Sequence, residues 1–231
     1  MHQKITSLLA ALLAAVLLCA CGGQPAQAPE PPEVPEEDAP YDFTLDYHRC
    51  APLVERQIGS DLVAAARLVI DAFLAGETTV TLPEGDYGGN PGNDLGYALY
   101  SMCPAFGAVT DYDDNHFDRA ARTVTWVYTQ TPEQVRQVLA SLEQTTGDCM
   151  SRLRRGDGET ARALTEQAAY DYDVSGTYDD DPAAYRFRTS SYAALVLHSG
   201  ICYSFAQALA FLYTQAGLDC AAVTGDGATG F

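Results

Sequence analysis

Cys202 is the residue whose type and position are best suited to chemistry in this sequence. It stands near the start of the segment GICYSFAQALAFLYTQAG, which runs from Gly200 to Gly217. The free backbone N–H groups at a helix N-terminus favour a thiolate, the nucleophilic form of cysteine. A cysteine in such a position also occurs as a small core residue, so spacing alone leaves both roles open. The segment is predicted to be a buried helix starting near Cys202, because its apolar residues recur at steps of three and four: Ile201, Phe205, Ala208, Leu209, Leu212 and Ala216.

Several short motifs around Cys202 resemble the nucleophile segment of bacterial transglutaminase-like proteins. They are Ser191-Tyr192-Ala193-Ala194-Leu195, Gly200-Ile201-Cys202, Phe205-Ala206-Gln207-Ala208, Leu212, Ala216-Gly217-Leu218-Asp219-Cys220 and Val223-Thr224-Gly225. Upstream, Ala169-Tyr170-Asp171-Tyr172-Asp173 resembles the segment that precedes the nucleophile in that family. The resemblance covers residues 157–231, and residues 41–155 carry no family motif.

The resemblance implies a fold and a reaction. The implied fold is α+β, with a papain-like core in which the Cys-bearing helix packs on an antiparallel sheet. Cys202 would be the nucleophile of a Cys-His-Asp triad. Members of the family attack glutamine side-chain amides or peptide bonds and pass the acyl group to an amine or to water. The expected substrate is therefore a protein or peptide, and no cofactor or metal is expected.

The triad is incomplete in this sequence. The histidine and aspartate of the family lie downstream of the cysteine on successive strands, whereas the sequence ends at Phe231. We therefore expect the sequence to be interrupted before both residues. His198 is the only local candidate for the base, but it matches no catalytic position of the family. His48 and His116 stand among aspartates and are predicted to be surface residues.

The N-terminus has the features of a bacterial lipoprotein. Residues 1–20 carry a cation, Lys4, followed by a short apolar run, as a secretory signal does. The sequence Leu18-Cys19-Ala20-Cys21-Gly22 resembles the lipoprotein box, which implies that Cys21 is lipidated. Residues 21–40 form an acidic, proline-rich linker that would hold the domain away from an anionic membrane. We expect an extracytoplasmic protein anchored to the bacterial membrane; a plain signal peptide with an incidental cysteine is the alternative.

Composition and motif spacing exclude several kinds of ligand. A formal net charge of −18 over 231 residues cannot neutralise a phosphate backbone, so nucleic-acid binding is excluded. The sole lysine is Lys4, which rules out lysine catalysis in the mature chain.

The segment Asp111–Asn115 copies the opening of a calcium loop, but His116 and Arg122 replace the required glycine and glutamate. We therefore predict a solvated acidic loop. Gly225-x-Gly227-x-x-Gly230 lacks the helix of a dinucleotide site.

The rest of the chain is predicted to be mainly helical. Helices are expected over 53–75, from Thr131 onward and near 161–168, and strands over 123–128 and 218–224. Residues 77–122 are predicted to be loops around one short helix. This divides the chain into a mainly helical region over 41–155 and a transglutaminase-like domain over 156–231, of which only the N-terminal part is present.

Five cysteines remain after the leader and the anchor, and outside the cell an odd count leaves one thiol free. They are Cys50, Cys103, Cys149, Cys202 and Cys220. Four cysteines allow three pairings, and the sequence does not choose among them.

The function that the sequence favours is a membrane-anchored cysteine acyltransferase or peptidase. The alternatives are a non-catalytic transglutaminase-like binding module, an inactive truncated lipoprotein and a solute-binding lipoprotein. Oligomeric state is left open.

Overall fold

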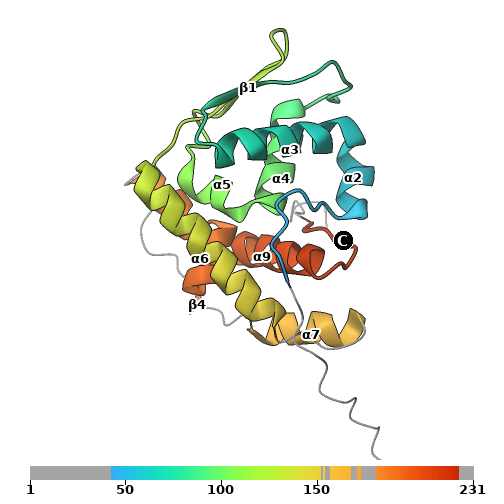
Figure 1. Cartoon of the computed structure of the whole chain (residues 1–231), viewed down its shortest axis with the longest axis vertical. Helices are drawn as coiled ribbons and strands as arrows, with labels where there is room; N and C mark the ends of the chain where they lie inside the picture. Colours follow the sequence, from blue (N-terminus) through green and yellow to red (C-terminus); the bar gives the residue numbers. More distant parts are fainter. Residues whose placement is uncertain (1–42, 152, 154–156, 168–170, 173–180, 224–231) are drawn as a thin grey trace, which may run out of the picture. The chain divides into compact units, whose positions relative to one another are not determined.

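The structure is a computed structural model that describes residues 43–151, 153, 157–167, 171–172 and 181–223 (Figure 1). Contacts between Cα atoms divide the chain into two compact units, Met1–Ala39 and Pro40–Phe231, and all described residues belong to the second. The signal peptide, Cys21, the linker and the Gly225–Gly230 pattern lie outside the described residues. No helix within the described ranges is both long enough and apolar enough to cross a membrane.

The first expected helix is two helices. α2 spans Pro52–Ile58 and α3 spans Ser60–Leu74, so the prediction of one continuous helix over 53–75 was wrong. Gly59 separates them with a φ of 93°, a left-handed backbone angle that glycine adopts without a steric penalty. The apolar face of α3 is buried, including Val69 and Phe73.

Residues 77–122 contain more regular structure than the sequence predicted. Two helices, α4 (Pro91–Met102) and α5 (Pro104–Val109), follow one another across Cys103. Each begins with a proline, which is favourable at the first helical position because its missing N–H would have no intrahelical acceptor. Two short strands, β1 (Thr79–Thr81) and β2 (His116–Asp118), flank this pair. The prediction of loops around one short helix was therefore wrong.

A three-stranded antiparallel sheet forms in the order β1-β3-β2. Its central strand β3 spans Thr123–Thr125, shorter than the expected 123–128. Val124 pairs with Val80 on one side and with Phe117 on the other. Beyond the strand, Trp126 is buried and its backbone N–H donates to the carbonyl of Thr78 at 3.0 Å. The sheet contacts α3 and α4.

α6 spans Pro132–Met150 and starts where the sequence predicted. The Gln134 N–H donates to Thr131 Oγ1 at 3.3 Å, and the Thr131 N–H donates to Gln134 Oε1 at 3.0 Å. These two hydrogen bonds make up the predicted capping box, which is confirmed. Val138 and Leu142, from the predicted apolar face, are buried.

Replacing Thr131 with alanine is expected to lower the free energy of unfolding by about 1 kcal/mol, because it removes the acceptor for a helix-terminal N–H. Urea unfolding followed by circular dichroism measures the change. Thr129→Ala is the matched control two residues earlier, and only a small change is expected from it. Equal effects of the two substitutions would contradict the capping role.

The C-terminal half is built mainly of helices. They are α7 (Asp157–Gln167), α8 (Pro182–Arg188), a π-helix η1 (Ala193–Leu197) and α9 (Cys202–Gln215). Two short strands, β4 (Asp171–Tyr172) and β5 (Ser199–Gly200), pair in parallel. Residues 218–223 form no strand, which corrects the prediction of one over 218–224 in the part of it that is described.

α9 has helices as its principal neighbours. It contacts α4, α7 and η1, whereas α3 and α4 lie between it and strand β1 (Figure 1). The described chain is thus an α+β structure, mainly helical with a small antiparallel sheet. Its core is continuous from α3 to α9 and includes Phe73, Phe106 and Phe211.

Candidate functional site

Cys202 is the first residue of α9 and is exposed to solvent. The preceding residue, Ile201, has an extended backbone, and the first N–H groups of the helix therefore have no intrahelical acceptor. The thiol lies at the N-terminus of a helix most of whose residues are buried, as the residue spacing predicted. This arrangement presents the Cys202 thiol to solvent at the end of a packed helix.

Ser204 fixes the start of α9. Its side chain is fully buried; its hydroxyl donates to the Thr189 carbonyl at 2.5 Å and accepts from the Ile201 N–H at 3.1 Å. Gly200 lies against it, so closely that a Cβ at this position would come within 2.9 Å of the Ser204 Cβ. The backbone before Cys202 is therefore held by two hydrogen bonds and by a contact that only glycine permits.

His198 lies just after the π-helix, with a left-handed backbone at φ 55°. It is exposed and lines a small cavity of about 20 Å³ together with Cys149, Leu195 and Phe205. In the described part of the chain, no hydrogen bond joins a histidine to Cys202. The structure therefore brings His198 to the same end of α9 without pairing it with the thiol.

A partly buried polar network, centred on the buried Gln207, lies on the side of α9 that faces α4. The Ser101 hydroxyl donates to Gln207 Oε1 at 3.1 Å, and Gln207 Nε2 donates to the Tyr203 hydroxyl at 3.1 Å. Burial raises the pKa of Tyr203, so this hydroxyl stays neutral beside Cys202. The apolar stripe of α9 does not by itself indicate this network. A signal was available, since the polar residues of α9 also recur at helical spacing: Ser204, Gln207, Thr214 and Gln215.

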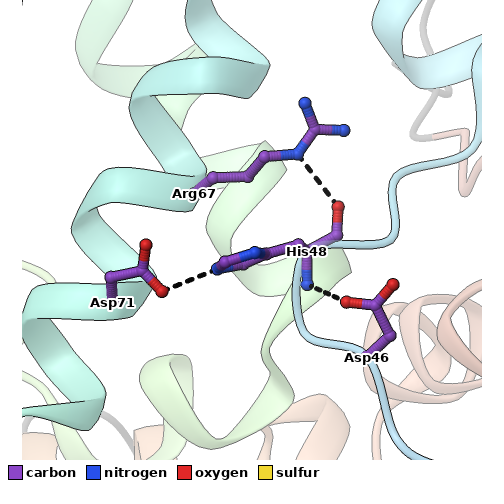
Figure 2. Close-up of polar contacts among 4 residues, drawn as sticks. All are labelled: Asp46, His48, Arg67 and Asp71. Atoms are coloured by element: carbon purple, nitrogen blue, oxygen red, sulfur yellow. Dashed lines mark hydrogen bonds and ion pairs between the residues drawn. The ribbon is translucent and has the colours of Figure 1, made fainter.

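His48 is part of a surface cluster (Figure 2). Its Nε2 lies 2.7 Å from Asp71 Oδ1, and both side chains are about half exposed, at 45% and 57%. Its backbone N–H donates to Asp46 Oδ1 at 2.8 Å, and Arg67 Nε donates to its carbonyl at 3.0 Å. The prediction that His48 is a surface residue is confirmed. These contacts hold the segment before α2 against α3.

A cavity of about 180 Å³ lies between α4 and the β2–β3 hairpin. Its walls include Tyr100, Phe106, Tyr112 and the exposed His116. In the acidic loop beside it, Asp113 accepts two hydrogen bonds from Arg186, at 2.9 and 3.0 Å, and the Arg186 guanidinium lies 4.7 Å from the centre of the Tyr112 ring. No group of three or more metal-binding side chains occurs within the described residues.

No disulfide links any of the five cysteines among the described residues. Burial raises the pKa of Cys103 to about 12 and that of Cys50 to about 11, and it also raises the pKa of Cys220. These thiols stay protonated at neutral pH and react slowly. Of the five, Cys202 alone is exposed.

No protein-family model, curated protein or solved structure matches the chain. The fold and the site together define an α+β protein with an exposed cysteine at a helix N-terminus. The assignment of a reaction to this cysteine is a proposal.

Proposed function

We propose that the protein is a transglutaminase-like cysteine acyltransferase or peptidase that acts on protein or peptide amides, with Cys202 as the nucleophile. The observation that carries the proposal is the exposure of Cys202 at the first residue of α9, while the other described thiols are wholly or partly buried. The sequence resemblance around Cys202 supports the same role. The buried Ser204 and Gln207 support it as well, because they fix the helix that carries the thiol.

In the proposed reaction, Cys202 Sγ attacks the carbonyl carbon of an amide and the amine departs with a proton. The resulting thioester then transfers its acyl group to water or to an amine. The free N–H groups at the start of α9 are suitable donors for the oxyanion that develops on the carbonyl oxygen. An imidazole must take the thiol proton and a carboxylate must orient that imidazole. The resemblance assigns both to positions downstream of Cys202.

The papain-like core is part of the proposal. The α+β class and the Cys-bearing helix agree with it, but α9 packs chiefly on helices in the described residues. The proposal therefore requires that the strands bearing the histidine and the aspartate come from residues outside those described. A non-catalytic binding module would need no such strands.

The proposed location is the outer face of a bacterial membrane, with a lipid on Cys21. The signal-like residues 1–20 and the lipoprotein-box resemblance support this. Expression in a bacterium with and without globomycin, an inhibitor of lipoprotein signal cleavage, tests it. The mature mass is expected to increase by the retained signal peptide; an unchanged mass would contradict the anchor.

Cys202 is expected to alkylate faster than glutathione, a free-thiol standard, when the full chain is treated with iodoacetamide at pH 7.5. A nucleophilic cysteine is present as thiolate near neutral pH, and the thiolate is the reacting form. Mass spectrometry of digested protein gives the rate at each cysteine. Cys50 and Cys103 serve as internal slow standards because burial raises their pKa to about 11 and about 12.

Cys202→Ser is expected to remove the fast label, whereas Cys149→Ser is the matched control and should retain it. A Cys202 that reacts no faster than glutathione would overturn the catalytic proposal and favour the non-catalytic binding module.

A further inference from the structure

The segment before α2 is bound to the end of α9. The Asp46 N–H donates to Gln215 Oε1 at 3.2 Å, and Gln215 Nε2 donates to the Asp46 carbonyl at 2.8 Å. The Arg49 guanidinium donates to the Gln215 carbonyl. Gln215 is fully buried, whereas Asp46 and Arg49 are exposed, so these hydrogen bonds are partly shielded from water. Residues 46–49 are thereby fixed beside the last turn of α9.

The start of α2 is bound to the residues that follow α9. The Leu53 N–H donates to Asp219 Oδ1 at 2.6 Å, and Arg56 donates to Asp219 Oδ2 at 2.9 Å. The Arg56 guanidinium lowers the pKa of Asp219 and keeps its carboxylate ionised. Cys50 lies between these two sets of contacts along one segment, and Cys220 directly follows Asp219 on the other. Hydrogen bonds before and after Cys50 therefore hold its segment against the segment that carries Cys220.

Both cysteines line one small cavity of about 10 Å³. A space of this size holds one water molecule at most. Among the described residues, the Cys220 thiol makes weak contacts with the Ala210 carbonyl at 3.4 Å and the Thr214 hydroxyl at 3.6 Å. The Cys50 thiol donates to the Ala51 carbonyl at 3.6 Å. Little is lost when these weak hydrogen bonds are exchanged for a covalent bond.

We propose that Cys50 and Cys220 form a disulfide under oxidising conditions, which locks the segment before α2 to the end of α9. The Sγ–Sγ bond forms and both S–H bonds break. The two electrons and two protons reduce a small disulfide oxidant, such as oxidised glutathione, to two thiols. The structure thereby selects one pairing among those that the sequence left open. The inference is independent of the reaction proposed for Cys202.

The full chain is incubated with oxidised glutathione at pH 8.5, remaining thiols are alkylated, and the protein is digested without reduction. Trypsin releases Cys50 in the peptide 50–56, and a protease that cuts before aspartate releases Cys220 in the peptide 219–225, separate from Cys202. The expected product is a peptide pair linked through Cys50 and Cys220 that disappears after reduction. A pair in which Cys50 is linked to another cysteine, or glutathione on Cys50 and Cys220 without a link, would overturn the proposal.

Thermal unfolding provides a second readout, compared within each variant between the oxidised and the reduced protein. The disulfide would close a loop of about 170 residues between positions 50 and 220. We expect oxidation to raise the unfolding midpoint by about 5–15 °C. Cys50→Ser and Cys220→Ser should each abolish this difference, and Cys149→Ser should retain it. A shift that persists in Cys50→Ser would contradict the assigned pair.

Discussion

Replacing Phe106 with alanine is expected to lower the free energy of unfolding by about 3–5 kcal/mol, a large part of the stability of an ordinary domain. The Phe106 ring is buried, and its centre lies 5.2 Å from that of Phe73 and 5.9 Å from that of Trp126, both in edge-to-face arrangements. Such aromatic pairs add to the free energy gained from burial alone. Removing the ring therefore costs the burial, the aromatic contacts and a cavity.

The Phe106 ring also lines the cavity of about 180 Å³ beside α4, so the space left by alanine would adjoin that cavity. The cost of a large-to-small substitution depends on how far the surrounding side chains close the space that remains. Urea unfolding followed by tryptophan fluorescence, with Trp126 as the probe, measures the change. Leu197→Ala is the exposed control, at 52% exposure, and should change stability by less than about 0.5 kcal/mol. A loss below about 1 kcal/mol for Phe106→Ala would show that this aromatic cluster is not part of the stabilising core.

Replacing Gly200 with alanine is expected to cost about 2–4 kcal/mol, from steric overlap together with disrupted hydrogen bonds. The new Cβ would lie 2.9 Å from the Ser204 Cβ and 3.0 Å from its Oγ. Ser204 cannot move aside without losing its hydrogen bonds to the Thr189 carbonyl and the Ile201 N–H, both of which are close to Cys202. The rate at which Cys202 is alkylated should therefore change together with stability.

Gly147→Ala is the matched control for this substitution. Gly147 lies inside α6, and a Cβ there would meet no atom within 4 Å. Alanine at that position should stabilise the protein by about 0.5–1 kcal/mol because it favours the helix. The double variant Gly200→Ala/Ser204→Gly should lose less stability than the sum of its single variants, since the second substitution removes the overlap. Fully additive losses would contradict the proposed contact.

Features encoded within a few neighbouring residues were predicted from the sequence. The capping box at Thr131 and the start of a helix at Cys202 are of this kind, because capping hydrogen bonds and helical spacing involve residues three or four positions apart. The surface position of His48 also followed from its polar neighbours. The capping hydrogen bonds form whenever the local backbone is helical. Neither they nor the surface position of His48 depend much on distant segments.

Features that depend on a distant partner were decided by the tertiary structure. Residues 218–223 have the composition of a strand, but a strand needs a neighbouring strand. Here Asp219 instead pairs with Leu53 and Arg56 of α2, and the Ala222 carbonyl accepts from the Tyr97 hydroxyl. Likewise, the sequence alone did not show that Gln207 is buried, because its partner Ser101 is 106 positions away.

The sequence by itself determined which cysteine begins a helix. Only the tertiary structure determined that this thiol is exposed, that Gly200 lies against Ser204, and that Cys50 and Cys220 line one cavity. The physical reason is the separation along the sequence between the residues that interact. Helix spacing and capping involve residues within about one helical turn of each other. Exposure, close packing and thiol pairing depend on which remote segments meet when the chain folds.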